Sequence, residues 1–330
     1  MGSSGASRED KLCLCLAARN PSFPRRPAGR TLPPAARRAA MSDALTADAV
    51  ARFRRDGYLP ATPAFPAAEA ARLRREIEAL EAARPMGAGG RPLNQYFRVN
   101  GHLVIPLLAG IARAPRVLDA VESLLGPDLL VWSVELFIKE PGSPATVSWH
   151  QDITYWGMGE TDEEVTAWIA LSEVSVESGC MRFLPGSHAG GVVAHRDSFA
   201  ADNLLSRGQE IEGVDEARAA HAPLAPGEMS LHHGRCFHAS GPNRSADRRI
   251  GAAIRYVTPA ARGVELPPDY AMPVRGADGL RRWIPVAGAR GLFDARDLAL
   301  YERVLQDQAR ALSAGAEGAV GLYAPAEVEA

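Results

Sequence analysis

Apolar residues repeat with a helical period in the first part of the chain and with a strand period further on. Three stretches before residue 128 place apolar side chains three and four positions apart, which is typical of helices with one buried face. Thr46 is a suitable N-cap for the first stretch, and Gly126 and Pro127 end the last. We therefore expect a helical layer at 46–127, with amphipathic helices at about 46–57, 66–84 and 113–127.

After residue 127 the pattern changes to short β-rich runs separated by Gly, Pro and Asp turns. The main runs are DLLVWSVELFIKEPG, EVTAWIALSEVS, GCMRFLPGSH, GEMSLHHGRCFHASG and RRIGAAIRYVTP. With almost no helix between them, they predict an all-β core with flanking helices, a sandwich or barrel over about 128–260. A long polar stretch at 189–222 interrupts this core, and such stretches are usually functional lids or disordered. One more helix is expected at 294–312.

The two ends of the chain differ from the middle. Residues 1–40 carry Pro and Arg clusters, have no acid after Asp10 and lack any apolar period. An Arg-rich, acid-poor start can resemble an organelle transit peptide, but LCLCLAA at 12–18 is too short for a signal peptide. We interpret 1–40 as a dispensable disordered extension, 41–318 as the folded domain and 319–330 as a flexible tail.

Composition narrows the class of protein. The chain has 330 residues, 46% of them hydrophobic and 23% charged, and a net charge of −2. Nothing in this balance favours nucleic-acid or membrane binding, and the most apolar run, at 103–112, is too short for a bilayer and contains Pro106. The four cysteines form no CxxC pair, which favours reduced thiols in a cytoplasmic protein.

The motif WHQD places His150 and Asp152 on one face of a strand, because side chains two positions apart point the same way. The run LHHGRCFHASGPN adds His232, His233 and His238 on another strand of the same core. Two imidazoles and one carboxylate, with three positions left open, form the facial triad of non-haem Fe(II) oxygenases. The HExxH motif of zinc hydrolases does not occur. Spacing alone does not decide which of the three histidines binds.

The span from about 46 to 288 resembles the phytanoyl-CoA dioxygenase family of 2-oxoglutarate-dependent oxygenases. The matching segments are LLGPDLLVW, FIKEPGS, WHQDITYW, TAWIALSEVSVESGCMRFLPGSH, PLAPGEMSLHHGRCFHASGPNRS and RRIGAAIRYVTP. The resemblance implies a double-stranded β-helix, that is, a cupin-like jelly-roll. It also implies Fe(II) held by His150, Asp152 and His238, with 2-oxoglutarate and O2 as co-substrates. His238 is the histidine that matches the family's H-x-S-G-x-N turn, so His232 and His233 are expected to pack in the core or behind the ligands.

The resemblance further assigns the 2-oxoglutarate site. The family pattern has an arginine eleven residues after the distal histidine, which is Arg249 here, and a guanidinium suits the free carboxylate of 2-oxoglutarate. Ser240 offers a hydroxyl, and Trp168 matches the family's tryptophan beside the co-substrate. Arg255 shares the strand parity of Arg249 and is its main competitor, whereas Arg248 faces the other way.

We therefore expect an Fe(II)- and 2-oxoglutarate-dependent dioxygenase that hydroxylates an unactivated C–H bond of a small molecule and releases succinate and CO2. Related halogenases replace the ligand carboxylate with a small residue, so the presence of Asp152 favours hydroxylation. The alternatives are a cupin-like metal enzyme that does not use 2-oxoglutarate and a catalytically silent jelly-roll binding protein.

Strand parity in VWSVELFIK suggests residues that contact the primary substrate. We expect an outer apolar face made of Trp132, Val134, Leu136 and Ile138. The opposite parity would point Ser133, Glu135 and Phe137 toward the iron. A buried carboxylate needs a cation or donor, so Glu135 either pairs with an arginine or binds a cationic group of the substrate. Two aromatic residues that follow the ligand pair, Tyr155 and Trp156, are further substrate candidates.

Overall fold

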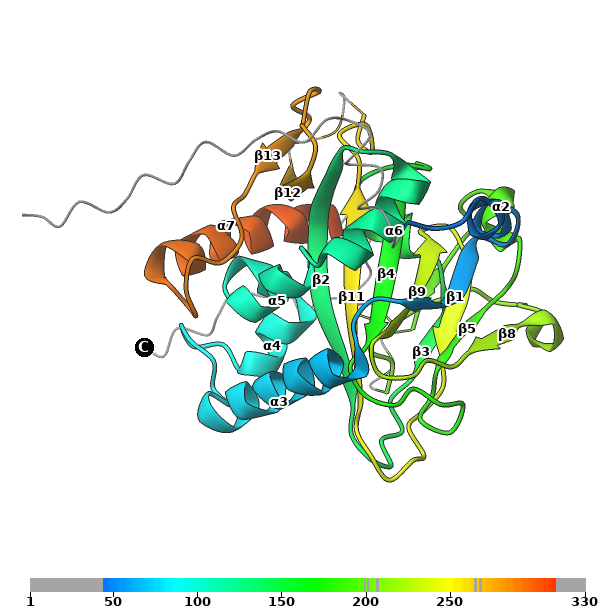
Figure 1. Cartoon of the computed structure of the whole chain (residues 1–330), viewed down its shortest axis with the longest axis horizontal. Coiled ribbons are helices and arrows are strands. Elements are labelled where there is room, and N and C mark those ends of the chain that lie inside the picture. The colour runs from blue at the N-terminus through cyan, green and yellow to red at the C-terminus, as the bar shows by residue number, and fades with distance from the viewer. Residues whose placement is uncertain are drawn as a thin grey trace, which may run out of the picture. The chain divides into compact units, whose positions relative to one another are not determined.

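Two β-sheets packed face to face form the centre of the computed structural model (Figure 1). The larger has seven strands in the order β1-β9-β4-β11-β2-β12-β13, and the smaller has four in the order β3-β10-β5-β8. The structure describes residues 44–312 apart from 199, 201, 206, 207, 264, 265, 267 and 268. The predictions for residues 1–40 and 319–330 lie outside this range.

The strands of the larger sheet come from distant parts of the chain. They are β1 (Tyr58–Pro63), β2 (Leu129–Lys139), β4 (Glu164–Ala170), β9 (Glu228–His233), β11 (Arg249–Val257), β12 (Asp269–Arg275) and β13 (Trp283–Pro285). The smaller sheet contains β3 (Val147–His150), β5 (Met181–Phe183), β8 (Ala220–Ala222) and β10 (His238–Ser240). Apolar side chains of both sheets meet in one cluster, among them Phe137, Val147, Trp168 and Phe183. This is the predicted double-stranded β-helix.

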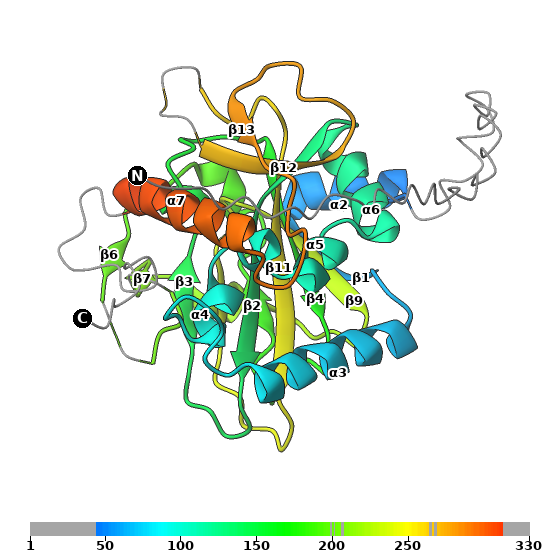
Figure 2. The same cartoon turned by 90° about the vertical axis from the view of Figure 1, so that its left-hand side faces the viewer.

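Helices cover the outer face of the larger sheet (Figure 2). They are α3 (Ala67–Ala83), α4 (Leu93–Arg98), α5 (Pro106–Ile111), α6 (Pro115–Leu125) and α7 (Ala295–Leu312). The first helix, α2 (Ala47–Asp56), begins after Thr46, whose side chain accepts a hydrogen bond from the Ala49 N–H, and ends at left-handed Gly57. The predicted helices at 46–57, 66–84, 113–127 and 294–312 are thus confirmed to within two residues at each end. Within the described residues, no helix is long and apolar enough to cross a membrane.

The sheet extends beyond the predicted core of 128–260. Strand β1 lies within the predicted helical layer yet pairs with β9, while β12 and β13 follow residue 260. The strands β1 and β13 are at the edges of the sheet, where strands are short and their pattern is weak. The inner strand β12 was missed because its run DYAMPVR contains Pro273, which argues against a strand. The stretch at 189–222 is not without structure: besides β8 it contains β6 (Arg196–Asp197) and β7 (Gln209–Glu210).

The expected outer face of β2 is wrong at one position. Val134, Leu136 and Ile138 pack under the helices as expected, but Trp132 belongs to a different apolar cluster, with Leu130 and Trp283, and Val131 packs under the helices instead. The pairing with β11 shifts register between Ser133 and Val131, so Trp132 is an extra residue in the strand. A β-bulge reverses the alternation of side chains, and strict parity cannot anticipate it.

Candidate metal centre

His150, Asp152 and His238 meet between the two sheets. His150 ends β3, Asp152 begins the 3-10 helix η2 (Asp152–Tyr155), and His238 begins β10. Antiparallel pairing of β10 with β3 puts His238 directly opposite His150. One ligand atom from each of the three side chains lies within 4.8 Å of the others, and all three residues are buried.

Hydrogen bonds orient both imidazoles for metal binding. Nδ1 of His150 lies 2.9 Å from the carbonyl of Ser148, and Nδ1 of His238 lies 2.9 Å from that of Cys236. Each Nδ1–H therefore donates to a carbonyl and leaves Nε2 with a free lone pair. These two Nε2 atoms lie 3.4 and 3.8 Å from Oδ1 of Asp152, which is itself an acceptor. Three acceptors directed at one point fit a divalent cation, and the donor set suits Fe(II).

The second carboxylate oxygen of Asp152 has partners of its own. Oδ2 lies 2.9 Å from the Thr166 hydroxyl and 3.3 Å from Nε2 of His232. Burial alone raises the pKa of Asp152, but the Arg255 charge and the hydrogen bonds to the carboxylate outweigh it and hold that pKa well below its ordinary value. Burial lowers the pKa of His238 well below its ordinary value, so this imidazole is neutral and able to bind metal.

The other two candidate histidines lie outside the triad. His232 supports Asp152 from behind, as just described. His233 is buried, but both of its ring nitrogens have other partners: Nε2 lies 3.0 Å from the carboxylate of exposed Asp162, and Nδ1 accepts a hydrogen bond from the Arg235 N–H at 3.0 Å. The expectation that neither residue is a primary ligand agrees with these positions.

A cavity that opens to solvent lies beside the triad. The space between its walls, open solvent included, amounts to about 350 Å3. Both sheets contribute side chains, and the lining comprises Phe137, Val147, His150, Asp152, Thr166, Trp168, Met181, Leu205, His232, His238, Ser240, Arg249, Ala253 and Arg255.

Arg249 is the first residue of β11, and its side chain lines this cavity. It is almost completely buried, donates a hydrogen bond to the carbonyl of Gly179 at 2.7 Å, and has its guanidinium carbon 5.3 Å from the centre of the Trp168 ring. Burial lowers its pKa to about 10, which still leaves the side chain charged at neutral pH. Since no carboxylate of the described residues lies within ion-pair distance of Arg249, an anionic ligand fits here.

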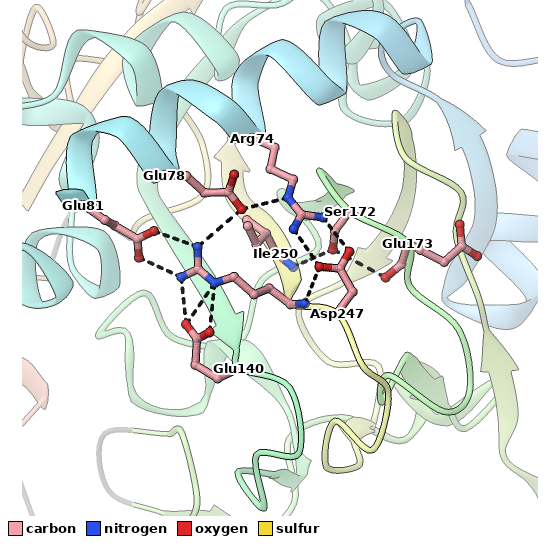
Figure 3. A network of polar contacts seen from close by, with 9 residues as sticks. Arg74, Glu78, Glu81, Glu140, Ser172, Glu173, Asp247 and Ile250 are labelled. Carbon is pink, nitrogen blue, oxygen red and sulfur yellow. Dashed lines mark hydrogen bonds and ion pairs between the residues drawn. The ribbon is translucent and has the colours of Figure 1, made fainter.

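The neighbouring Arg248 is held on the outside. Its guanidinium binds Glu81 of α3 at 2.8 Å and Glu140 at 2.8 Å, within a network that also joins Arg74 to Asp247 (Figure 3). Because strand side chains alternate, an outward Arg248 places Arg249 inside. The prediction that Arg248 and Arg249 point to opposite faces of the strand agrees with the structure.

Two further basic side chains near Arg249 were missed by sequence reasoning. Lys139 faces Arg249 across the β2–β11 pair, and its Nζ donates to Oγ of Ser240 at 2.9 Å and to the carbonyl of Gly241 at 2.5 Å. Arg98 of α4 lies over the Phe137 ring at 4.6 Å. Burial, together with Arg249 and Arg98, lowers the pKa of Lys139 to about 6. The feature of the sequence that could have drawn attention to Lys139 is the rarity of lysine, since the whole chain contains only two.

The substrate candidates surround Arg255. The Glu135 carboxylate lies 3.2 Å from Arg255 and accepts a hydrogen bond from Ser133 at 3.2 Å. Phe137 lines the cavity, and the Trp156 ring lies 5.3 Å from the Arg255 guanidinium carbon. The side chain of the remaining candidate, Tyr155, lies outside the described part of the chain.

Taken together, a two-histidine, one-carboxylate triad inside a double-stranded β-helix defines the class of mononuclear non-haem iron oxygenases. Residues 53–251 match the family model described as phytanoyl-CoA dioxygenase (PhyH). The match spans more than half of the chain, and the protein belongs to this family.

Individual relatives agree with the class. A probable alpha-ketoglutarate-dependent hypophosphite dioxygenase of Stutzerimonas stutzeri is 29% identical over 61% of this chain and 74% of its own. The structure of the apo form of a non-haem monooxygenase, ThoJ, is 33% identical, covers 81% of this chain and 98% of that one, and gives a TM-score of 0.69. CytC3 with Fe(II) and alpha-ketoglutarate is 25% identical over 76% of this chain and 97% of its own, with a TM-score of 0.55. The protein is accordingly an enzyme that uses Fe(II) and 2-oxoglutarate (alpha-ketoglutarate).

Proposed function

We propose that this protein is a dioxygenase that hydroxylates an unactivated C–H bond of a small molecule and converts 2-oxoglutarate to succinate and CO2. The observation that carries the proposal is the convergence of three acceptor atoms beside a cavity that ends at a buried arginine. The presence of Asp152 supports hydroxylation rather than halogenation, because its carboxylate occupies the position beside the metal that a halide would need.

In this proposal His150, Asp152 and His238 hold the iron, and the carbonyls of Ser148 and Cys236 keep the two imidazoles in the binding tautomer. The bound iron supplies the activation of O2. The surrounding β-sheets exclude water from the reacting groups, which is the usual contribution of the protein in cofactor-dependent oxidation.

We assign the distal carboxylate of 2-oxoglutarate to Arg249, with Ser240 as a hydroxyl partner and Trp168 as the wall of the site. Arg255 is the competing cation, but its charge is already balanced by Glu135 at 3.2 Å. Arg249 has no such partner among the described residues, and this difference favours it.

We place the primary substrate beside Phe137 and Trp156, next to Arg255. The substrate is a small molecule, and nothing in the charge of the chain favours a nucleic acid or a membrane as partner. A cytoplasmic location is part of the proposal and rests on the cysteines, since Cys180 and Cys236 are free buried thiols.

The test is to incubate the purified protein with Fe(II), 2-oxoglutarate, 18O2 and a panel of candidate small molecules. One atom of labelled oxygen in succinate and one in a hydroxylated product are expected for each 2-oxoglutarate consumed. Metal-dependent turnover without succinate would instead identify a cupin-like enzyme that does not use 2-oxoglutarate. If neither metal nor 2-oxoglutarate bound, the protein would be a silent binding protein.

A further inference from the structure

A buried glutamate lies behind the candidate iron ligand Asp152. Glu164, the first residue of β4, is completely buried, and its Oε1 lies 2.9 Å from the hydroxyl oxygen of Thr166. The same hydroxyl oxygen lies 2.9 Å from Oδ2 of Asp152. Thr166 therefore bridges two carboxyl groups.

Counting protons favours a protonated form of one of the two carboxyl groups. A hydroxyl carries one proton and can donate to only one acceptor at a time. An ionised carboxylate has no proton to donate, so two ionised carboxylates would leave one of the two 2.9 Å contacts without a proton. Two contacts among three oxygen atoms require two protons, one from the hydroxyl and one from a carboxylic acid.

The surroundings identify Glu164 as the acid. Asp152 receives a further hydrogen bond from His232 and has the Arg255 guanidinium 3.9 Å away. Both contacts stabilise an ionised carboxylate. Among the described residues, no cation lies within ion-pair distance of Glu164, whose buried charge would be costly. Its burial, followed by the nearby Asp152 charge, raises the pKa of Glu164 well above its ordinary value.

We propose that Glu164 is a neutral carboxylic acid that donates its proton to Thr166, and that Thr166 in turn donates to Oδ2 of Asp152. This inference rests on the proposed iron site. With Oδ2 held by Thr166 and His232, Asp152 has only Oδ1 to offer the metal and binds through one oxygen. A second bond from Oδ2 would take one of the three positions that 2-oxoglutarate and O2 require. Glu164 and Thr166 are positioning residues that act through Asp152.

The first test is infrared spectroscopy of the metal-free protein, which does not depend on turnover. The wild type should show the carbonyl stretch of a buried carboxylic acid, and this band should be absent from Glu164→Gln. Thr166→Val removes the acceptor of the acid proton, so the same band should move to higher frequency. If the spectra of both variants kept the acid band of the wild type unchanged, the proposal would be overturned.

The second test is Fe(II) affinity, measured by competition with a chelator in the absence of O2. Thr166→Val should weaken binding about 10- to 100-fold, as is usual when the support of a metal ligand is lost. Thr166→Ser keeps the hydroxyl, and Glu164→Gln keeps a neutral donor to Thr166, so both should retain wild-type affinity. Glu164→Gln with as large a loss as Thr166→Val would show that Glu164 acts as a charge and would refute the relay. If the wild type bound no Fe(II), the proposed iron site would be refuted instead. The infrared test would still decide whether Glu164 is protonated, because it uses the metal-free protein.

Discussion

The Arg255 guanidinium lies 3.2 Å from the Glu135 carboxylate, and both side chains are nearly buried, at 7% and 13% exposure. Sequence parity left two interpretations of Glu135, a structural ion pair or a contact to a cationic substrate. The structure shows the ion pair. Arg255, rather than Glu135, is among the residues that line the cavity, so the group presented to the primary substrate is a cation with its charge already balanced.

Replacing Glu135 with Gln should destabilise the fold. Arg255 would lose the nearer of two carboxylates within ion-pair distance while remaining buried, and breaking a buried ion pair by removing one partner costs up to about 3–5 kcal/mol. Urea unfolding of the variant measures the loss. Glu140→Gln is the matched control, because Glu140 pairs with Arg248 at the surface with its side chain 61% exposed, where ion pairs contribute about 0–1 kcal/mol. Equal losses in the two variants would contradict a buried ion pair at Glu135.

Replacing His238 with Ala should abolish Fe(II) binding and 2-oxoglutarate turnover, because only two of the three converging acceptors remain. His233→Ala is the control: this side chain contacts Asp162 at the surface, so iron affinity should be unchanged. Iron titration under anaerobic conditions and succinate release check both variants. Loss of binding in His233→Ala with retention in His238→Ala would move the distal ligand to His233.

Arg249→Ala should raise KM for 2-oxoglutarate by about 10- to 100-fold, since a charge-assisted hydrogen bond contributes about 1.5–3 kcal/mol. Iron affinity should change little, because Arg249 does not contact the triad. The control is Arg248→Ala, which removes an adjacent cation that points away from the cavity. A raised KM in Arg255→Ala alone would transfer the role to Arg255.

The sequence predicted the fold because strand periodicity and family motifs are local properties. Two strand placements were wrong: β3 ends at His150, so Asp152 lies in η2 rather than on the same strand, and His232 and His233 lie on β9 whereas His238 lies on β10 of the other sheet. Where a strand ends depends on its pairing with other strands, which the alternation of side chains does not record. Trp132 was misplaced because a bulge depends on the pairing of β2 with β11, which no local pattern records. Lys139 and Glu164 could not be assigned from sequence either, since their importance comes from burial beside residues on other strands.

Lys139 should make stability depend on pH. Its pKa in the folded protein is about 6, whereas the unfolded chain has the ordinary value of 10.5. Between these values the unfolded state binds more protons, so the free energy of unfolding falls as pH is lowered from 10.5 toward 6. Lys139→Met removes this titration and should flatten that part of the profile. Urea unfolding at several pH values compares the slopes, and a parallel shift of the two curves would mean that Lys139 keeps an ordinary pKa.

Gly251 and Trp168 should form an energetically coupled pair. A Cβ at position 251 of β11 would lie 1.9 Å from the Trp168 ring, far closer than two carbon atoms can approach. Gly251→Ala should therefore displace Trp168, whose ring lies 5.3 Å from the Arg249 guanidinium carbon. We expect a loss of about 1–3 kcal/mol, typical of overpacking, and a higher KM for 2-oxoglutarate.

Gly110→Ala serves as the control, because a Cβ there would meet nothing within 4 Å and Ala favours a helix. The decisive measurement is a double-mutant cycle with Trp168→Phe, whose smaller ring makes room for the new methyl group. The double variant should be more stable than the sum of the two single losses predicts. Strict additivity would show that the strain at residue 251 is relieved elsewhere, and the tryptophan would then owe its position to other contacts.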